Sequence, residues 1–120
     1  MIVAISAAAA QAQVADPEIL SAKFDAQGRL KVRASYAGYE GCYLSVNGGL
    51  KRNKVETGIT SKQLSAAEAE AGVTAIRTLR KYYCQKRTLY VNVELVCLGD
   101  VIGQGTSEAV AVTVPVGNRR

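Results

Sequence analysis

The strongest chemical signal in the sequence is a run of basic and aromatic side chains in its second half. The run has no Asp or Glu within it, and its members are Arg77, Arg80, Lys81, Tyr82, Tyr83, Lys86 and Arg87. Basic side chains interleaved with aromatic rings suit a surface that follows phosphates and stacks bases. An anionic lipid or polysaccharide would need the same cations. The alternative interpretation is a solvated face, because surface charge also promotes solubility.

The whole chain shares this basic character. Its 120 residues carry 15 Lys and Arg against 10 Asp and Glu, which gives a formal net charge of +5. A second, smaller basic cluster consists of Lys51, Arg52 and Lys54. Net charge bears on solubility and nonspecific association rather than on fold. It therefore adds an anionic polymer to the possible partners without identifying one.

The residues needed for most side-chain catalysis are missing or badly spaced. The sequence contains no His, which excludes a His-activated Ser or Cys nucleophile, a His-containing zinc site and a His pH switch. Glu68 and Glu70 are two residues apart on a predicted helix and point to different sides. Asp100 stands alone, whereas a calcium site needs several oxygens at fixed intervals. We expect a protein that is not an enzyme and that uses no metal and no cofactor.

Three cysteines, Cys42, Cys84 and Cys97, bear on the compartment. None belongs to a C-x-x-C pair, so a zinc or thioredoxin-type site has no support. Cys42 and Cys97 both fall on apolar faces of predicted strands, and we predict that they form a disulfide, a bond typical of exported proteins. The alternatives are a disulfide that involves Cys84, or no disulfide, since a free Cys is often a small buried hydrophobe.

The first residues form a short apolar run. Residues 2–10 are too few to span a bilayer, which takes about 20 residues. They match the hydrophobic part of a secretory signal, and Ala10-Gln11-Ala12 matches its cleavage site. No Lys or Arg precedes Lys23, so the positive start of such a signal is missing. We predict that residues 1–12 are a signal-peptide remnant or an apolar arm, and that residues 13–120 form a single domain.

Apolar and polar side chains alternate along much of the remaining chain, as they do in strands with one buried face. The predicted strands are 18–24, 29–36, 42–47, 50–57, 88–98 and 108–116. Asn47-Gly48-Gly49 and the glycine-rich stretch 99–105 are predicted turns, because Gly and Asn accept positive φ. The basic segment 50–57 is expected at a sheet edge, where Lys discourages pairing with other chains.

One segment departs from this alternation. Ser65 and Glu68 have the spacing of a capping box, the residues after Ser65 are good helix formers, and Gly72 is a natural stop. A short helix is therefore predicted near residues 62–72. For residues 73–83 both a helix and a strand remain open, and the β-branched content favours the strand.

About seven short strands, with turn signals between them, are typical of an antiparallel β-sandwich. The end of the chain has a long strand, a Gly/Asp loop and an alternating Val strand before Pro115. In this it resembles the last two strands of immunoglobulin-like and fibronectin type III modules, over roughly residues 87–115. The Cys-Trp-Cys core of antibody domains is missing, since there is no Trp. The resemblance implies an all-β, immunoglobulin-like sandwich that binds, spaces or assembles, and it brings no catalytic residues.

Together these features predict a non-catalytic exported module, secreted or periplasmic, with no membrane span. It would act by binding a protein partner through its surface or by assembling with copies of itself. One alternative is a viral structural subunit, such as a capsid decoration or tail protein, located in the virion. The other is a binder of nucleic acid or another anionic polymer through residues 77–87.

Overall fold

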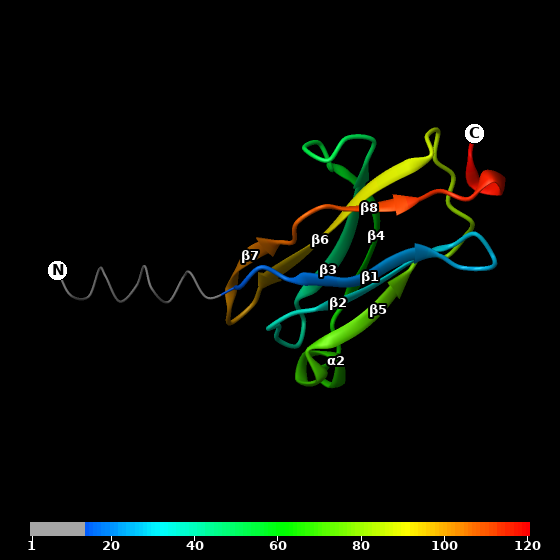
Figure 1. Ribbon diagram of the computed structural model, residues 1–120. Helices are drawn as coiled ribbons and strands as arrows, with labels where there is room; N and C mark the ends of the chain where they lie inside the picture. Colours follow the sequence, from blue (N-terminus) through cyan, green and yellow to red (C-terminus); the bar gives the residue numbers. More distant parts are fainter. Residues whose placement is uncertain (1–13) are drawn as a thin grey trace.

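Residues 14–120 are described by a computed structural model, and within them eight β-strands form two antiparallel sheets (Figure 1). The first sheet has the order β1 (Glu18–Phe24), β2 (Leu30–Ser35), β5 (Val73–Arg77). The second has the order β4 (Thr57–Gln63), β3 (Tyr43–Gly49), β6 (Thr88–Leu98), with β7 (Ile102–Thr106) and β8 (Val110–Thr113) both along the far edge of β6. The predicted all-β antiparallel sandwich is confirmed. The predicted residues 1–12, signal remnant or arm, lie outside the described residues.

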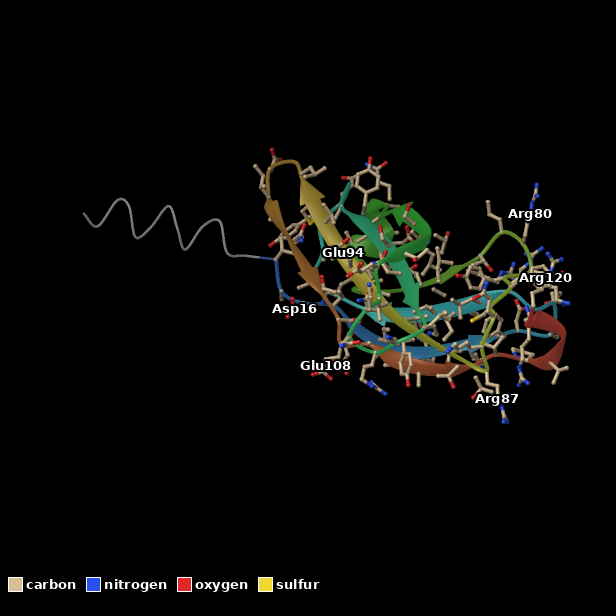
Figure 2. The ribbon with its side chains drawn as sticks, turned by 90° about the horizontal axis from the view of Figure 1, so that it is seen from above. Asp16, Arg80, Arg87, Glu94, Glu108 and Arg120 are labelled. Atoms are coloured by element: carbon tan, nitrogen blue, oxygen red, sulfur yellow. A yellow bond between two sulfur atoms is a disulfide. The ribbon has the colours of Figure 1, made fainter. Side chains whose placement is uncertain are left out.

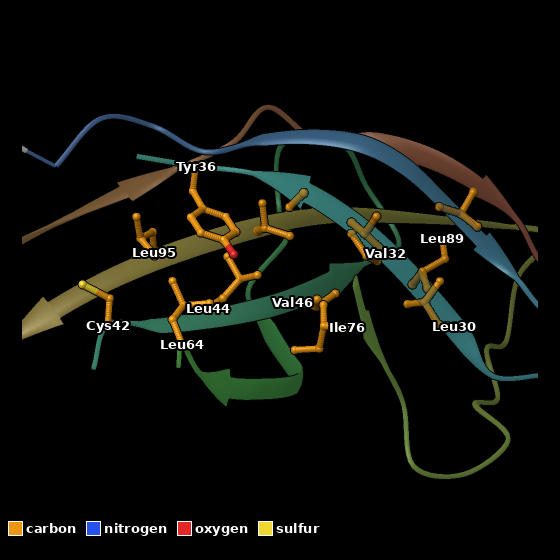
Figure 3. Packing of buried hydrophobic residues seen from close by; sticks show 14 of the residues in the cluster. Leu30, Val32, Tyr36, Cys42, Leu44, Val46, Leu64, Ile76, Leu89 and Leu95 are labelled. Carbon is orange, nitrogen blue, oxygen red and sulfur yellow. The ribbon is translucent and has the colours of Figure 1, made fainter. Parts of the chain in front are cut away.

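The core consists of the inward faces of the two sheets, and strict alternation produces it. In β6, every second side chain from Leu89 to Cys97 is buried. β2 buries Leu30, Val32 and Ala34 in the same way. Figure 3 shows these side chains meeting those of β3 between the sheets. Each fully buried Leu or Val contributes about 1.5–3 kcal/mol relative to an exposed one, so this layer is the main source of stability.

The glycine-rich stretch 99–105 is only partly the turn that was predicted. β7 begins at Ile102 and pairs with β6 through Gly103, Gln104 and Gly105. Gly105 is buried, and a Cβ there would lie 2.6 Å from the carbonyl oxygen of Ala15. The glycine therefore permits the chain before β1 to cross closely over β7, and does not mark a turn.

The predicted strand 50–57 is also wrong. β3 continues through the glycines to Gly49, and β4 starts only at Thr57. Residues 50–56 form the connecting turn, closed by an isolated bridge between Lys51 and Lys54. The physical reason is local, because the Lys54 N–H donates to the Lys51 carbonyl at 3.1 Å and turns the chain back on itself. It returns so closely that a Cβ on Gly49 would lie 2.0 Å from the carbonyl oxygen of Lys54. The basic cluster 51–54 consequently lies on a turn and not on an edge strand.

The predicted short helix is present as α2 (Ala66–Ala71). Ser65 caps it, both hydrogen bonds of the capping box with Glu68 are formed, and Gly72 ends it with φ of 71°. The open choice for residues 73–83 is resolved in two parts. β5 covers Val73–Arg77 and pairs with β2, and the chain is irregular from Thr78 to the start of β6. A 3₁₀ helix, η1 (Val116–Asn118), follows β8.

Glu68 connects α2 to both sheets. Its carboxylate forms an ion pair with Lys62 of β4 and accepts a 2.7 Å hydrogen bond from the hydroxyl of Thr74 of β5. These contacts and the Ser65 backbone N–H lower the pKa of Glu68 to about 2, and the hydrogen bond from Lys62 is the largest cause. The hydroxyl of Tyr36 donates to the carbonyl of Glu68 at 2.9 Å.

We expect the Glu68→Gln variant to lose part of the pH dependence of stability. Because the folded pKa of about 2 is below the ordinary 4.5, the carboxylate stabilises the fold above pH 4.5, and this contribution is lost as the pH falls towards 2. Gln keeps the capping acceptor but carries no charge. Urea titrations should show that the free energy of unfolding falls between pH 7 and pH 3 by about 1 kcal/mol more in the wild type than in the variant. The expected difference is no larger because the Glu68–Lys62 pair is partly exposed. Equal losses in the two proteins would contradict this role for Glu68.

Candidate functional site

The strand register divides the connections of the sandwich between two opposite ends. Phe24 faces Leu30, Gly49 faces Tyr90, and Thr88 faces Thr113. One end is therefore built from residues 25–29, 50–56, 78–87 and 114–120. The other is built from residues 14–17, 36–42, 64–72 and 99–101, as the pairing of Glu18 with Ser35 and of Leu98 with Ile102 requires. Figure 1 shows the two sets of connections well separated.

Charge is segregated between these ends. We call the first the basic end, and its two acids are Asp25 and Glu56. Its cations are Arg29, Lys51, Arg52, Lys54, Arg80, Lys81, Lys86, Arg87, Arg119 and Arg120. The second, called the acidic end, has Asp16, Glu40, Glu68, Glu70 and Asp100 and neither Lys nor Arg. Figure 2 shows Arg80, Arg87 and Arg120 at one end of the molecule, with Arg80 and Arg87 on opposite sides of that end, and Asp16 at the other end. The acids are isolated along the sequence, so only the topology reveals that they converge.

Loop 78–87, the centre of the predicted binding run, is fixed by buried contacts. Asn118 is 3% exposed, and its side-chain amide donates to the carbonyls of Gly28 and Tyr82, both at 2.7 Å. Thr78 donates its N–H to the carbonyl of Leu30 at 3.0 Å, and its hydroxyl accepts the Leu30 N–H at 3.0 Å. The loop thus presents its side chains from a held backbone, which lowers the entropy cost of binding.

The two tyrosines of the loop have different surroundings. Tyr82 is half-buried and packs against the core, and burial is the main cause that raises its pKa. Tyr83 is 40% exposed. The guanidinium carbon of Arg120 lies 3.9 Å from the centre of the Tyr83 ring, and Lys81 Nζ lies 5.6 Å from it. Tyr83 is therefore the ring that the surface presents, and Arg120 joins the site from a part of the chain that sequence reasoning did not connect to it.

Arg77 lies apart from the other cations of the run. It belongs to β5, and its guanidinium is 3.5 Å from the carboxylate of Asp25 in the β1–β2 turn. The pKa of Asp25 is lowered, chiefly because its carboxylate accepts the backbone N–H of Arg29. Arg77 is thus partly neutralised, which reduces its contribution to an anion-binding surface.

Arg80, Lys86 and Arg87 are exposed, and neither of the two ion pairs within residues 14–120 involves them. Lys81 is exposed and is likewise outside both pairs. Like charges on one loop without carboxylate partners raise the local positive potential, which attracts anions over roughly a Debye length, about 8–10 Å at physiological salt. The basic end carries more charged residues than the acidic end, and it contains residues 78–87 of the run that the sequence predicted as a binding surface.

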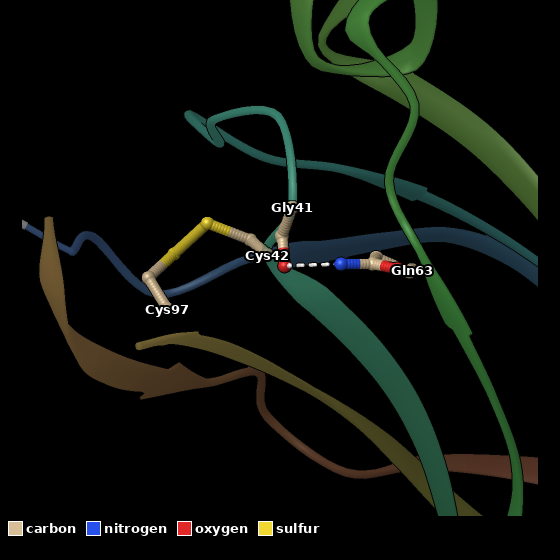
Figure 4. Close-up of a disulfide and its surroundings, with 4 residues drawn as sticks. All are labelled: Gly41, Cys42, Gln63 and Cys97. Carbon is tan, nitrogen blue, oxygen red and sulfur yellow. Dashed lines mark hydrogen bonds between the residues drawn. A yellow bond between two sulfur atoms is a disulfide. The ribbon is translucent and has the colours of Figure 1, made fainter. Parts of the chain in front are cut away.

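A cleft of about 470 Å³ lies at the acidic end. Its lining comprises Tyr39, Glu40, Gly41, Cys42, Gln63, Leu98, Gly99, Asp100 and Val101. The predicted disulfide is confirmed beside it, where Cys42, directly before β3, and Cys97 of the adjacent strand β6 have their Cα atoms 4.4 Å apart (Figure 4). Gln63 Nε2 donates to the carbonyl of Gly41 at 3.3 Å. Cys84 is buried as a free thiol.

The described part of the chain shows no group of three or more potential metal-ligating side chains. No helix within residues 14–120 has the length and apolar character needed to cross a membrane. Comparison with known proteins gives no match to a family model, to a curated protein or to a solved structure. The charge distribution and the two end surfaces are therefore the observations that bear on function.

Proposed function

We propose that this protein is a non-catalytic, exported β-sandwich module that binds an anionic partner through its basic end. The observation that carries the proposal is the set of exposed cations on a fixed loop, Arg80, Lys81, Lys86 and Arg87, which have no carboxylate partner within residues 14–120. Because the loop is already ordered in the folded protein, binding costs little conformational entropy. The positive charge of these side chains then attracts an anionic partner.

The strand order supports assignment to the immunoglobulin-like class. The first, second and fifth strands form one sheet, and the fourth, third, sixth and seventh form the other, in which the eighth also pairs with the sixth. Immunoglobulin-like sandwiches likewise place their early strands in one sheet and their third, sixth and seventh in the other. The Cys42–Cys97 bond differs from that of antibody domains, because it links the residue directly before β3 to the neighbouring strand β6 of the same sheet and does not join the two sheets.

The disulfide also supports export. Disulfides persist in secreted and periplasmic compartments and are rare where thiols are kept reduced. Cys42 and Cys97 are buried, at 3% and 1% exposure, so the bond is part of the folded core. An exported location would bring the basic end into contact with anionic polysaccharides, lipids or protein surfaces.

We expect reversal of two cations at the basic end to weaken anion binding about tenfold or more. The test variant is Arg80→Glu with Arg87→Glu. Both residues accept hydrogen bonds within the fold through their backbone carbonyls, so the substitutions leave these contacts in place. Each reversal replaces an attraction of roughly 1 kcal/mol in water by a repulsion. Binding of a fluorescent heparin fragment and of a thymidine oligonucleotide should be measured by anisotropy.

The matched control is Lys23→Glu with Arg33→Glu, which makes the same change in net charge at exposed positions of β1 and β2. This control should bind almost as the wild type does. Equal loss in both variants, or no binding by the wild type, would refute the proposal. Similar affinity for the two probes indicates a general anion surface, and a strong preference for the oligonucleotide identifies nucleic acid as the partner.

A further inference from the structure

We infer that the partner of the basic end is the acidic end of a second copy of this chain, so that copies associate head to tail. This inference rests on the proposed function and names its partner. Its first support is charge complementarity: the basic end carries an excess of cations that are outside both ion pairs within residues 14–120. The acidic end carries five carboxylates and no Lys or Arg, and only Glu68 among these five is paired, with Lys62 of β4. Opposed potentials of this kind steer association and fix the orientation of partners.

The second support is an apolar contact site within each charged end. At the basic end, Leu79 is 86% exposed and lies directly beside Arg80. At the acidic end, Leu98 is 72% exposed and Tyr39 47% exposed, and both line the cleft together with Glu40 and Asp100. Interfaces commonly combine an apolar centre with a polar rim. Leu79 fits the apolar part of the cleft, and Arg80 then meets the carboxylates.

The third support is the rigidity of both surfaces. The cleft lies between residues 39–42 and 98–101, and the disulfide links Cys42 to Cys97, the residue directly before the second segment. The opposing loop is held by the buried hydrogen bonds of Asn118 and Thr78. Surfaces that are ordered before contact lose little conformational entropy on binding.

The placement of the two surfaces determines the kind of assembly. They lie at opposite ends of one sandwich, so the contact joins two different surfaces. A pair of copies therefore still has one free basic end and one free acidic end. Such heterologous contacts produce open chains unless the rotation between copies closes a ring. We therefore expect linear assemblies whose mean length grows with concentration and falls with salt.

Two charge-reversed variants test this with a mixing experiment. Glu40→Lys with Asp100→Lys makes the cleft basic. Arg80→Glu with Arg87→Glu changes the basic end from ten cations and two acids to eight cations and four acids, and it places negative charge in the loop 78–87, directly beside Leu79 at one of the two positions. In sedimentation velocity at low salt, the wild type should self-associate and each variant alone should be monomeric. An equimolar mixture should associate again, because the unaltered basic end of the first variant then meets the unaltered acidic end of the second. A monomeric wild type, or a mixture that stays monomeric, would overturn the inference.

Leu79→Ser tests the apolar contact separately. It should raise the dissociation constant for self-association about tenfold or more, because the variant no longer buries a Leu side chain in the cleft. Leu20→Ser, at a partly exposed position of β1, is the control and should leave association unchanged. An equal effect of the two substitutions would remove Leu79 from the interface.

The same proteins separate failure of this inference from failure of the proposed function. The Glu40→Lys, Asp100→Lys variant should bind the heparin fragment at least as well as the wild type, although it cannot self-associate. If the wild type binds heparin but stays monomeric, the basic end is an anion site and the second copy is not its partner. If it does neither, both the proposed function and the inference are wrong.

Discussion

Replacement of Cys42 and Cys97 together by alanine is expected to lower the free energy of unfolding by about 2–4 kcal/mol. The two cysteines are separated by 55 residues in sequence, so without the bond the unfolded chain gains the entropy of a long open loop. The loss corresponds to a decrease in melting temperature of roughly 10–20 °C. Thermal and urea unfolding of both proteins would measure it.

Reduction provides the control for this prediction. Dithiothreitol should lower the melting temperature of the wild type and leave that of the double variant unchanged. Mass spectrometry of a nonreduced digest should show the Cys42 and Cys97 peptides linked and the Cys84 peptide free. A wild type whose stability is insensitive to reduction would show that the bond contributes nothing to the fold.

Gly49→Ala is the second substitution for which we expect a large loss of stability, about 2 kcal/mol. The new Cβ would lie 2.0 Å from the carbonyl oxygen of Lys54 and 3.0 Å from Val55 Cα. Both are backbone atoms, so the variant can fold only if the turn 50–56 shifts away from the end of β3. Urea unfolding gives the magnitude.

Gly58→Ala is the matched control, because Gly58 lies in the same β3–β4 hairpin and a Cβ there meets no atom within 4 Å. Its stability should remain within about 0.5 kcal/mol of the wild type. Comparable losses in the two variants would mean that the hairpin is sensitive to any added Cβ, and that the close approach at Gly49 is not the cause.

The strands that could be predicted are those in which alternation is strong and uninterrupted. β6 was predicted with both its ends correct, because burial of every second side chain fixes its register as well as its extent. The capping box and Gly72 similarly located α2, since caps act through neighbouring residues. Both elements depend on residues that are close together in the sequence, so they can be predicted from the sequence alone.

The glycines show where local chemistry was insufficient. Gly49 and Gly105 suggested turns, but each is needed because another backbone segment passes close to it. The passing segments are Lys54 in one case and Ala15 in the other. Such contacts depend on the tertiary structure, and a single sequence gives no sign of which segment will cross which glycine.

The candidate site was predicted in part for a related reason. The run from Arg80 to Arg87 is continuous in sequence, so its charge was evident. Arg120 and the acidic end were missed, because they come together only when β1–β2, β6–β7 and the C-terminal segment are placed by the sandwich. Tyr82 and Tyr83 are adjacent in sequence, and only packing distinguishes the half-buried ring from the exposed one.

The salt dependence of heparin binding tests most directly whether the basic end is the functional surface. For binding through several ionic interactions, the logarithm of the association constant falls linearly with the logarithm of salt concentration. We predict a steep line for the wild type. The line for the Arg80→Glu, Arg87→Glu variant should be shallower by about one for each anionic group that it no longer neutralises. A flat wild-type line, or equal slopes for the two proteins, would contradict the assignment of function to this end of the molecule.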